Sequence, residues 1–178
     1  MKSKILLGLL LLSSYCGFAQ NENLTGKWSG IITIDVDQAI PRTIYFNLQI
    51  KQSGKAVWGI YTTGEDSTFI SSTCCTGKLT SKLSSGKNSI IGFFQDGIVE
   101  NKIPLDICSS LNYIQASYSG DGKDEFLKGK WYSIYNNKLA VDGAAGRFVL
   151  EKLSTETDIN IDQYFPRLPE LIKKFNIE

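Results

Sequence analysis

Histidine is absent from all 178 residues of the chain, and this absence removes several classes of active site. Ser-His-Asp and Cys-His hydrolases need histidine as the base that activates their nucleophile. Zinc, copper and non-haem iron sites built on imidazole ligands are excluded for the same reason. Carboxylate pairs, a lysine or tyrosine site and oxygen-ligated calcium remain open, but no acidic pair is placed to face a common cleft. We therefore predict a non-enzymatic protein without a metal site or a cofactor.

The chain also lacks an excess of charge of either sign. It has 19 lysine and arginine residues against 18 aspartate and glutamate residues, a formal net charge of +1 at pH 7. Proteins that bind nucleic acid or anionic membranes usually carry a basic patch or stripe. No such stripe is visible in the sequence, so we expect neither partner.

Long apolar runs are missing except at the N-terminus. Ile5–Leu12 is apolar but too short to cross a bilayer. Lys2 and Lys4 precede this run, and Gly17-Phe18-Ala19 follows with small residues where a signal peptidase cleaves. We therefore predict a signal peptide over residues 1–19, with an uncleaved anchor as the alternative. The mature protein is then periplasmic or secreted and has no transmembrane segment.

Cysteine is scarce, with four residues in the whole chain. The mature chain keeps Cys74, Cys75 and Cys108, and an exported protein folds where disulfides form. We predict a bond between Cys108 and one of the adjacent pair, with a strained bond between Cys74 and Cys75 as the alternative. In either case one thiol stays unpaired in a monomer.

Short segments with alternating apolar and polar residues make up most of the mature chain. In Thr43–Gln52 every second residue is apolar, which is typical of a strand with one dry face and one wet face. Short turns rich in glycine, serine and asparagine separate many of the segments. The predicted strands are 27–36, 43–52, 55–63, 74–83, 89–95, 111–119, 125–135 and 147–153.

Eight such strands with mostly short links predict an all-β fold. An eight-stranded, mostly antiparallel up-and-down barrel has no exposed sheet edge, so we prefer it to a β-sandwich. The barrel domain is expected over residues 20–154. Residues 155–178 are expected to form a polar linker, 155–162, and an amphipathic C-terminal helix over 166–175. This helix packs on the barrel wall or, alternatively, serves as a lid or a docking peptide.

One tripeptide occurs twice, as Gly26-Lys27-Trp28 and as Gly129-Lys130-Trp131. Trp28 opens the first strand, and Arg147 near the start of the last strand is placed to stack its guanidinium over that ring. A Gly-x-Trp on strand one with an arginine on the last strand resembles the calycin barrels, the lipocalins and avidins, over residues 24–153. The resemblance implies that Trp28 and Arg147 close one end of the barrel.

The resemblance to avidins extends to two further positions. Tyr61-x-Thr63 on the third strand is similar to the Tyr-x-Ser/Thr ligand contacts of that family, and Trp131 falls where avidins place a tryptophan in the pocket wall. The polar residues that avidins carry after the first tryptophan are replaced here by Ile31 and Ile32, so biotin is not expected.

Aromatic residues on the central strands suggest where a ligand would bind. They can line a pocket for a small molecule, or they can fill the barrel as core. The predicted ligand-binding residues are Trp58, Tyr61, Thr63, Phe94, Tyr113 and Trp131. We predict an exported binding protein for a small apolar or sugar-like ligand. The alternative is a structural or interaction module of the cell envelope, with a filled barrel and a protein partner.

Overall fold

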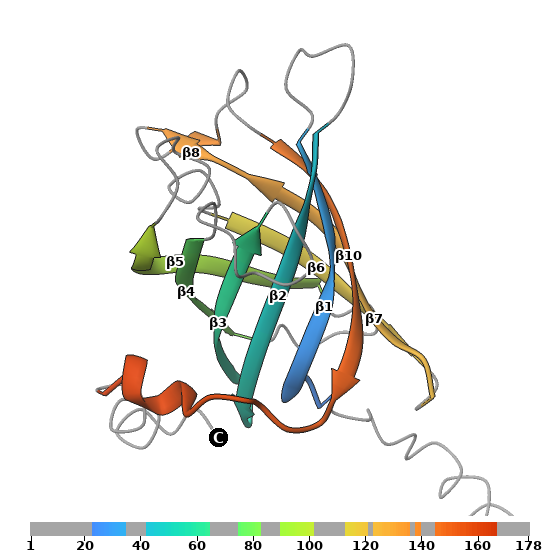
Figure 1. Ribbon diagram of the computed structural model, residues 1–178, viewed down its shortest axis with the longest axis vertical. Helices are drawn as coiled ribbons and strands as arrows, with labels where there is room; N and C mark the ends of the chain where they lie inside the picture. Colours follow the sequence, from blue (N-terminus) through green and yellow to red (C-terminus); the bar gives the residue numbers. More distant parts are fainter. Residues whose placement is uncertain are drawn as a thin grey trace, which may run out of the picture.

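The computed structural model confirms the all-β prediction and the closed barrel (Figure 1). It describes residues 23–34, 42–64, 75–82, 90–101, 113–120, 123–135, 138–139 and 145–166. The barrel strands are β1 (Gly26–Ile34), β2 (Arg42–Ser53), β3 (Ala56–Gly64), β4 (Cys75–Lys82), β5 (Ile90–Asn101), β6 (Tyr113–Gly120), β7 (Glu125–Tyr132) and β10 (Ala145–Ser154). Two short strands, β8 (Ile134–Tyr135) and β9 (Lys138–Leu139), form a separate ribbon.

Each barrel strand pairs antiparallel with its neighbours, in the order β1-β10-β7-β6-β5-β4-β3-β2. Pairing of β1 with both β2 and β10 closes the cylinder, so no barrel strand is left at an edge. β5 continues to Asn101, although the sequence predicted a loop from Asp96 onward. The pairing of β4 with β5 shifts register at two points, which lets the longer strand follow the barrel.

Strand alternation separates a core from a surface, as β2 illustrates. Its inward residues are buried and belong to one continuous cluster with inward residues of all the other barrel strands. These residues are Ile44, Phe46, Leu48 and Ile50. The outward Tyr45 and Lys51 are exposed. A shift of one residue would turn the whole apolar set to water, so the pattern fixes the register.

The lower end in Figure 1 contains the start of β1, the turn between β2 and β3, and the end of β10. Gly54 in that turn has a φ of 52°, a left-handed conformation that favours glycine.

Residues 155–166 do not form a free linker but run against the outer wall of β2 and β3 (Figure 1). Ile161 and Phe165 are buried against Trp58 and Ile60 of β3 in a second apolar cluster. A short 3-10 turn, η1 (Ile161–Tyr164), lies in this segment. The predicted helix 166–175 and the predicted signal peptide 1–19 lie outside the described residues, except for Pro166. Among the described residues, no helix is both long enough and apolar enough to span a membrane.

Candidate functional site

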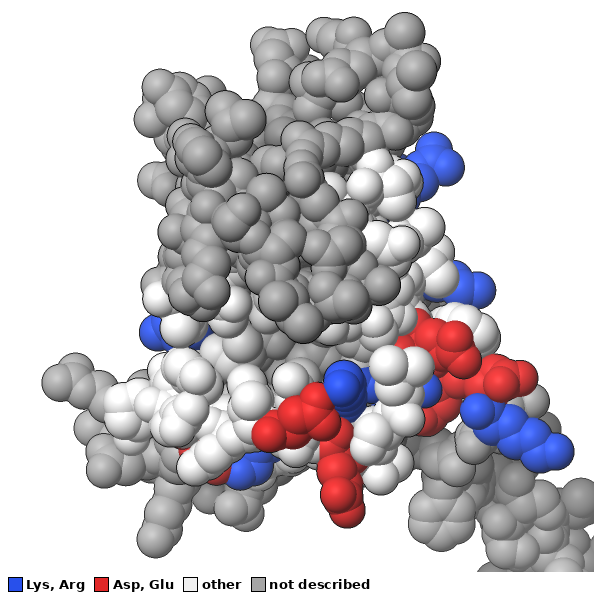
Figure 2. All heavy atoms as spheres, viewed as in Figure 1, with Lys and Arg blue, Asp and Glu red and all other residues white. Residues whose placement is uncertain are grey.

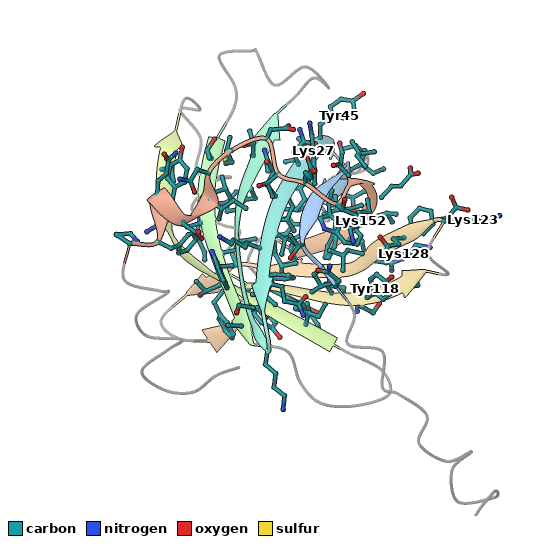
Figure 3. All side chains as sticks on the ribbon, turned by 90° about the horizontal axis from the view of Figure 1, so that it is seen from below. Lys27, Tyr45, Tyr118, Lys123, Lys128 and Lys152 are labelled. Carbon is teal, nitrogen blue, oxygen red and sulfur yellow. The ribbon has the colours of Figure 1, made fainter. Side chains whose placement is uncertain are left out.

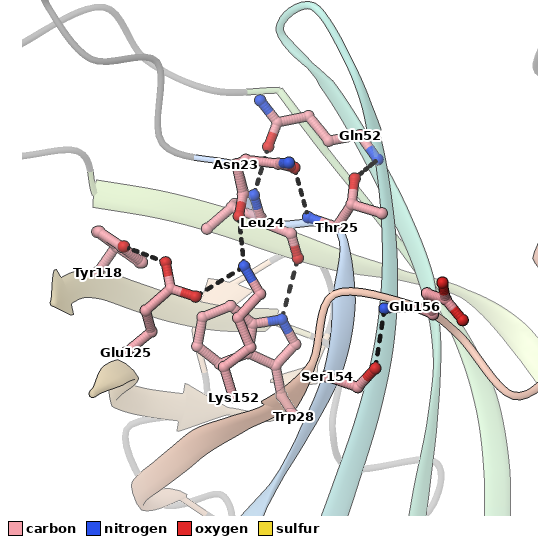
Figure 4. Close-up of polar contacts among 10 residues, drawn as sticks. All are labelled: Asn23, Leu24, Thr25, Trp28, Gln52, Tyr118, Glu125, Lys152, Ser154 and Glu156. Atoms are coloured by element: carbon pink, nitrogen blue, oxygen red, sulfur yellow. Dashed lines mark hydrogen bonds and ion pairs between the residues drawn. The ribbon is translucent and has the colours of Figure 1, made fainter. Parts of the chain in front are cut away.

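Trp28 is buried at the lower end of the barrel, and Lys152 covers its ring (Figure 4). The indole is fully buried, and its Nε1 donates a hydrogen bond to the Leu24 carbonyl oxygen at 3.0 Å. Trp28 and Lys152 are paired positions on β1 and β10. The Lys152 ammonium lies 5.2 Å from the ring centroid, where the face of the indole attracts a cation.

The prediction that Arg147 stacks on Trp28 is wrong, because Arg147 lies on the other face of β10. In this strand Phe148 and Leu150 point inward, whereas Arg147 is exposed on the outer wall. The inward series continues to Lys152, which is level with Trp28. β10 therefore does place a cation over Trp28, but this cation is Lys152, five residues after Arg147.

Lys152 also joins a polar network on one side of the lower end of the barrel (Figures 3 and 4). Its Nζ lies 2.9 Å from Glu125 Oε2 and donates to the Asn23 carbonyl oxygen at 2.8 Å. Glu125 Oε1 in turn accepts a hydrogen bond from the Tyr118 hydroxyl at 2.5 Å. The hydrogen bond from Tyr118, followed by Lys152, holds the pKa of Glu125 below its ordinary value of 4.5.

We expect acid to destabilise the protein through Glu125. A carboxyl whose pKa is lowered by folding contributes stability above its unfolded pKa and loses it as the pH falls through the folded value. The melting temperature should therefore fall as the pH drops below 4.5, and Glu125→Gln should flatten that part of the profile. Circular dichroism melting across this pH range measures the effect, with the exposed Glu151→Gln as the control. If the melting temperature of Glu125→Gln fell with pH as steeply as that of the parent, Glu125 would not be the group responsible.

Tyr61 and Thr63 lie inside the barrel, as buried parts of its core. The Tyr61 ring packs over Gly77 of β4, where a side chain would overlap it, and its hydroxyl accepts a hydrogen bond from Gln95 Nε2 at 2.6 Å. Burial raises the pKa of Tyr61 to about 12. Thr63 is fully buried, with its hydroxyl 2.9 Å from the Cys75 sulfur. Both polar side chains therefore have partners on other strands of the barrel.

Trp131 also points inward and ties β7 to β1. Its Nε1 donates to the Thr33 carbonyl oxygen at 2.8 Å. To reach β1 the indole passes across β10 at Gly146, the position that pairs with Trp131. Each copy of the Gly-Lys-Trp tripeptide thus places one buried indole across the interior, Trp28 at the lower end and Trp131 towards the upper end.

The other three predicted ligand residues lie on the outer wall, so the six do not form one pocket. Trp58 is covered by the C-terminal segment, and its Nε1 donates to Asp162 Oδ1 at 3.2 Å. Phe94 is 55% exposed, and its ring centroid is 4.9 Å from that of the half-buried Tyr113. Alternation explains the split, because Trp58 and Tyr61 are an odd number of residues apart on one strand.

Tyr132 was missed by the sequence analysis, although it extends the outer aromatic pair. Tyr113 pairs with Phe94 on one side and with Tyr132 on the other, and the Tyr113 and Tyr132 rings stack with centroids 6.2 Å apart. The three residues form a cross-strand row over β5, β6 and β7, which we call the aromatic row. Knowledge of the register of β6 and β7, in which Tyr113 pairs with Tyr132, would have identified Tyr132 as part of the aromatic row.

The disulfide stays a prediction, because Cys74 and Cys108 lie outside the described residues. Within the described part of the chain, no group of three or more cysteine, aspartate or glutamate residues is arranged to hold a metal ion. No protein-family model matches the chain, and no curated protein matches it either. The eight-stranded antiparallel barrel is consistent with a calycin-like fold.

Proposed function

We propose that the protein is an exported, non-enzymatic binding protein that holds a sugar-like ligand on the outer wall of its barrel, at the aromatic row. One observation carries the proposal: the Phe94 ring is 55% exposed beside Tyr113 and Tyr132. Full burial of such a ring is worth roughly 1.5–3 kcal/mol, and a ring that is half exposed forgoes part of that free energy. Sugars present faces of C–H groups that pack on aromatic rings, so this row suits such a ligand.

The packing of the interior supports an external site. The large rings inside the barrel are at most 3% exposed and belong to one core cluster. They are Trp28, Phe46, Tyr61, Phe93, Trp131 and Phe148. Removing any of them to admit a ligand would sacrifice core packing, whereas the aromatic row can be covered by a ligand without rearrangement.

Binding to soluble polysaccharides, neutral and acidic, tests the proposal by affinity electrophoresis or calorimetry. We expect at least one polysaccharide to bind and Phe94→Ala together with Tyr132→Ala to weaken it by about tenfold, as for interface aromatic residues. Tyr45→Ala removes a ring that is also exposed, at 40%, but lies on β2. This control should bind like the parent.

Two results would contradict the proposal. One is the absence of binding to any polysaccharide of a broad panel. The other is full binding by the double variant, or loss of binding in Tyr45→Ala instead, which would place the contact away from the aromatic row. Thermal melting of all variants checks that the fold is intact, since Phe94 makes little buried contact.

A further inference from the structure

The outer faces of β6, β7 and β10 carry a second row of residues beside the aromatic row. Register places Arg147 opposite Lys130, and Lys130 opposite Gln115. Two residues further along the strands, Lys128 lies opposite Ser117. Rows on one face of a strand are separated by about 7 Å, so these polar and basic side chains directly adjoin the aromatic row.

Three cations gather on this wall without acidic partners. Lys128, Lys130 and Arg147 are all exposed, and none forms an ion pair with any residue in the described part of the chain. The Lys128 ammonium instead lies over the Phe126 ring, 4.7 Å from its centroid. In the view of Figure 2 the coloured acidic residues gather at the lower end of the barrel, whereas the upper part carries basic ones.

The grouping of like charges on this wall lowers the stability of the fold, which favours a role for them in binding. Like charges directly opposite one another on a sheet face are unfavourable, and Lys130 faces Arg147 in this way. The sequence shows no basic stripe, because these residues come from two strands separated by the connection between β7 and β10. A bound anion would remove the repulsion.

A depression lies between β6 and β7, beside the three cations. It has a volume of about 320 Å³ and is lined by Gln115, Ser117, Lys128, Lys130 and Tyr132. Tyr132 belongs both to the aromatic row and to the lining of this depression. A ligand that stacks on the row can therefore extend into the depression without leaving the wall.

We infer that the ligand of this surface is an acidic saccharide chain, one that carries carboxylate or sulfate groups on its rings. This inference rests on the proposed function. The rings stack on Phe94, Tyr113 and Tyr132. The acidic groups bind Lys128 and Lys130 in and beside the depression, with Arg147 adjoining, and the hydroxyl groups bind Gln115 and Ser117. Neither the aromatic row nor the cations alone distinguishes a saccharide from other ligands, but their adjacency fits a ring polymer with regularly spaced anions.

The test compares a uronic acid polymer with an uncharged glucan, using the full mature chain and calorimetry at low and high salt. We expect the uronic acid polymer to bind more tightly than the glucan and to weaken at high salt. Lys128→Gln together with Lys130→Gln should weaken its binding by about tenfold. Lys55→Gln, at the exposed turn between β2 and β3, is the matched control and should bind like the parent.

The outcomes separate this inference from the proposed function. Equal binding of both polymers, unaffected by the lysine variants, would overturn the acidic ligand while leaving the aromatic site in place. Loss of all binding in the aromatic variants but not in the lysine variants would do the same. Binding to vesicles of anionic lipid that depends on Lys128 and Lys130 but not on Phe94 would assign the cations to a membrane surface and also overturn the inference. The double lysine variant should melt no lower than the parent, since it relieves the repulsion from Arg147.

Discussion

Replacing Trp28 by alanine should lower the free energy of unfolding by about 3–5 kcal/mol. The indole is fully buried at the lower end of the barrel, so its loss leaves a cavity that neighbouring strands cannot fill. The Leu24 carbonyl oxygen loses its hydrogen bond, and Lys152 loses the ring that it covers. A typical domain is stable by only about 5–15 kcal/mol, so this single change removes a large part of the total.

Urea denaturation followed by circular dichroism measures this effect. Trp28→Phe is the graded comparison, because it keeps most of the apolar volume and loses the hydrogen bond to Leu24. We expect it to cost about 1–2 kcal/mol. Should Trp28→Ala cost less than Trp28→Phe, or less than about 1 kcal/mol, Trp28 would not close this end of the barrel.

The strand pattern of the sequence predicted the barrel well because each strand has one dry face. In β2 the four inward residues stand two apart, so the pattern determines both the strand and its buried face. The same pattern fails in β10, where Val149 and Leu153 are apolar yet exposed. The apolar residues of that strand do not define one face, so the pattern alone does not show that Arg147 points outward and Lys152 inward.

The candidate site was harder to predict than the fold because it depends on contacts between strands. Trp58 and Tyr61 are close in sequence, but alternation places them on opposite faces of β3. Lys130 and Arg147 are far apart in sequence, and only the pairing of β7 with β10 makes them neighbours. Alternation along one strand can be read from the sequence, but the pairing of Lys130 with Arg147 cannot. Register must be known before an outer surface can be read.

Gly146 occupies a place where even a methyl group should be costly, and Gly146→Ala should lower the free energy of unfolding by about 3 kcal/mol. A Cβ at this position would overlap the Thr33 carbonyl oxygen and lie 2.5 Å from Trp131 Nε1. These two atoms form the hydrogen bond that ties β7 to β1, so relief of the overlap must lengthen that bond.

The matched control is Gly92→Ala, which adds the same methyl group to another barrel strand. There the new Cβ would lie 2.9 Å from the Tyr113 hydroxyl, the far end of a side chain on the outer wall. A tyrosine on the surface can move, whereas the Thr33 backbone is held by its strand pairing. We expect Gly92→Ala to change the free energy of unfolding by less than about 1 kcal/mol. Replacing a glycine within a strand by alanine also lowers the entropy cost of folding, which offsets the displacement of Tyr113. Equal urea midpoints for the two variants would mean that Trp131 can leave Thr33 without cost. Its indole would then be core filling rather than a brace across β10.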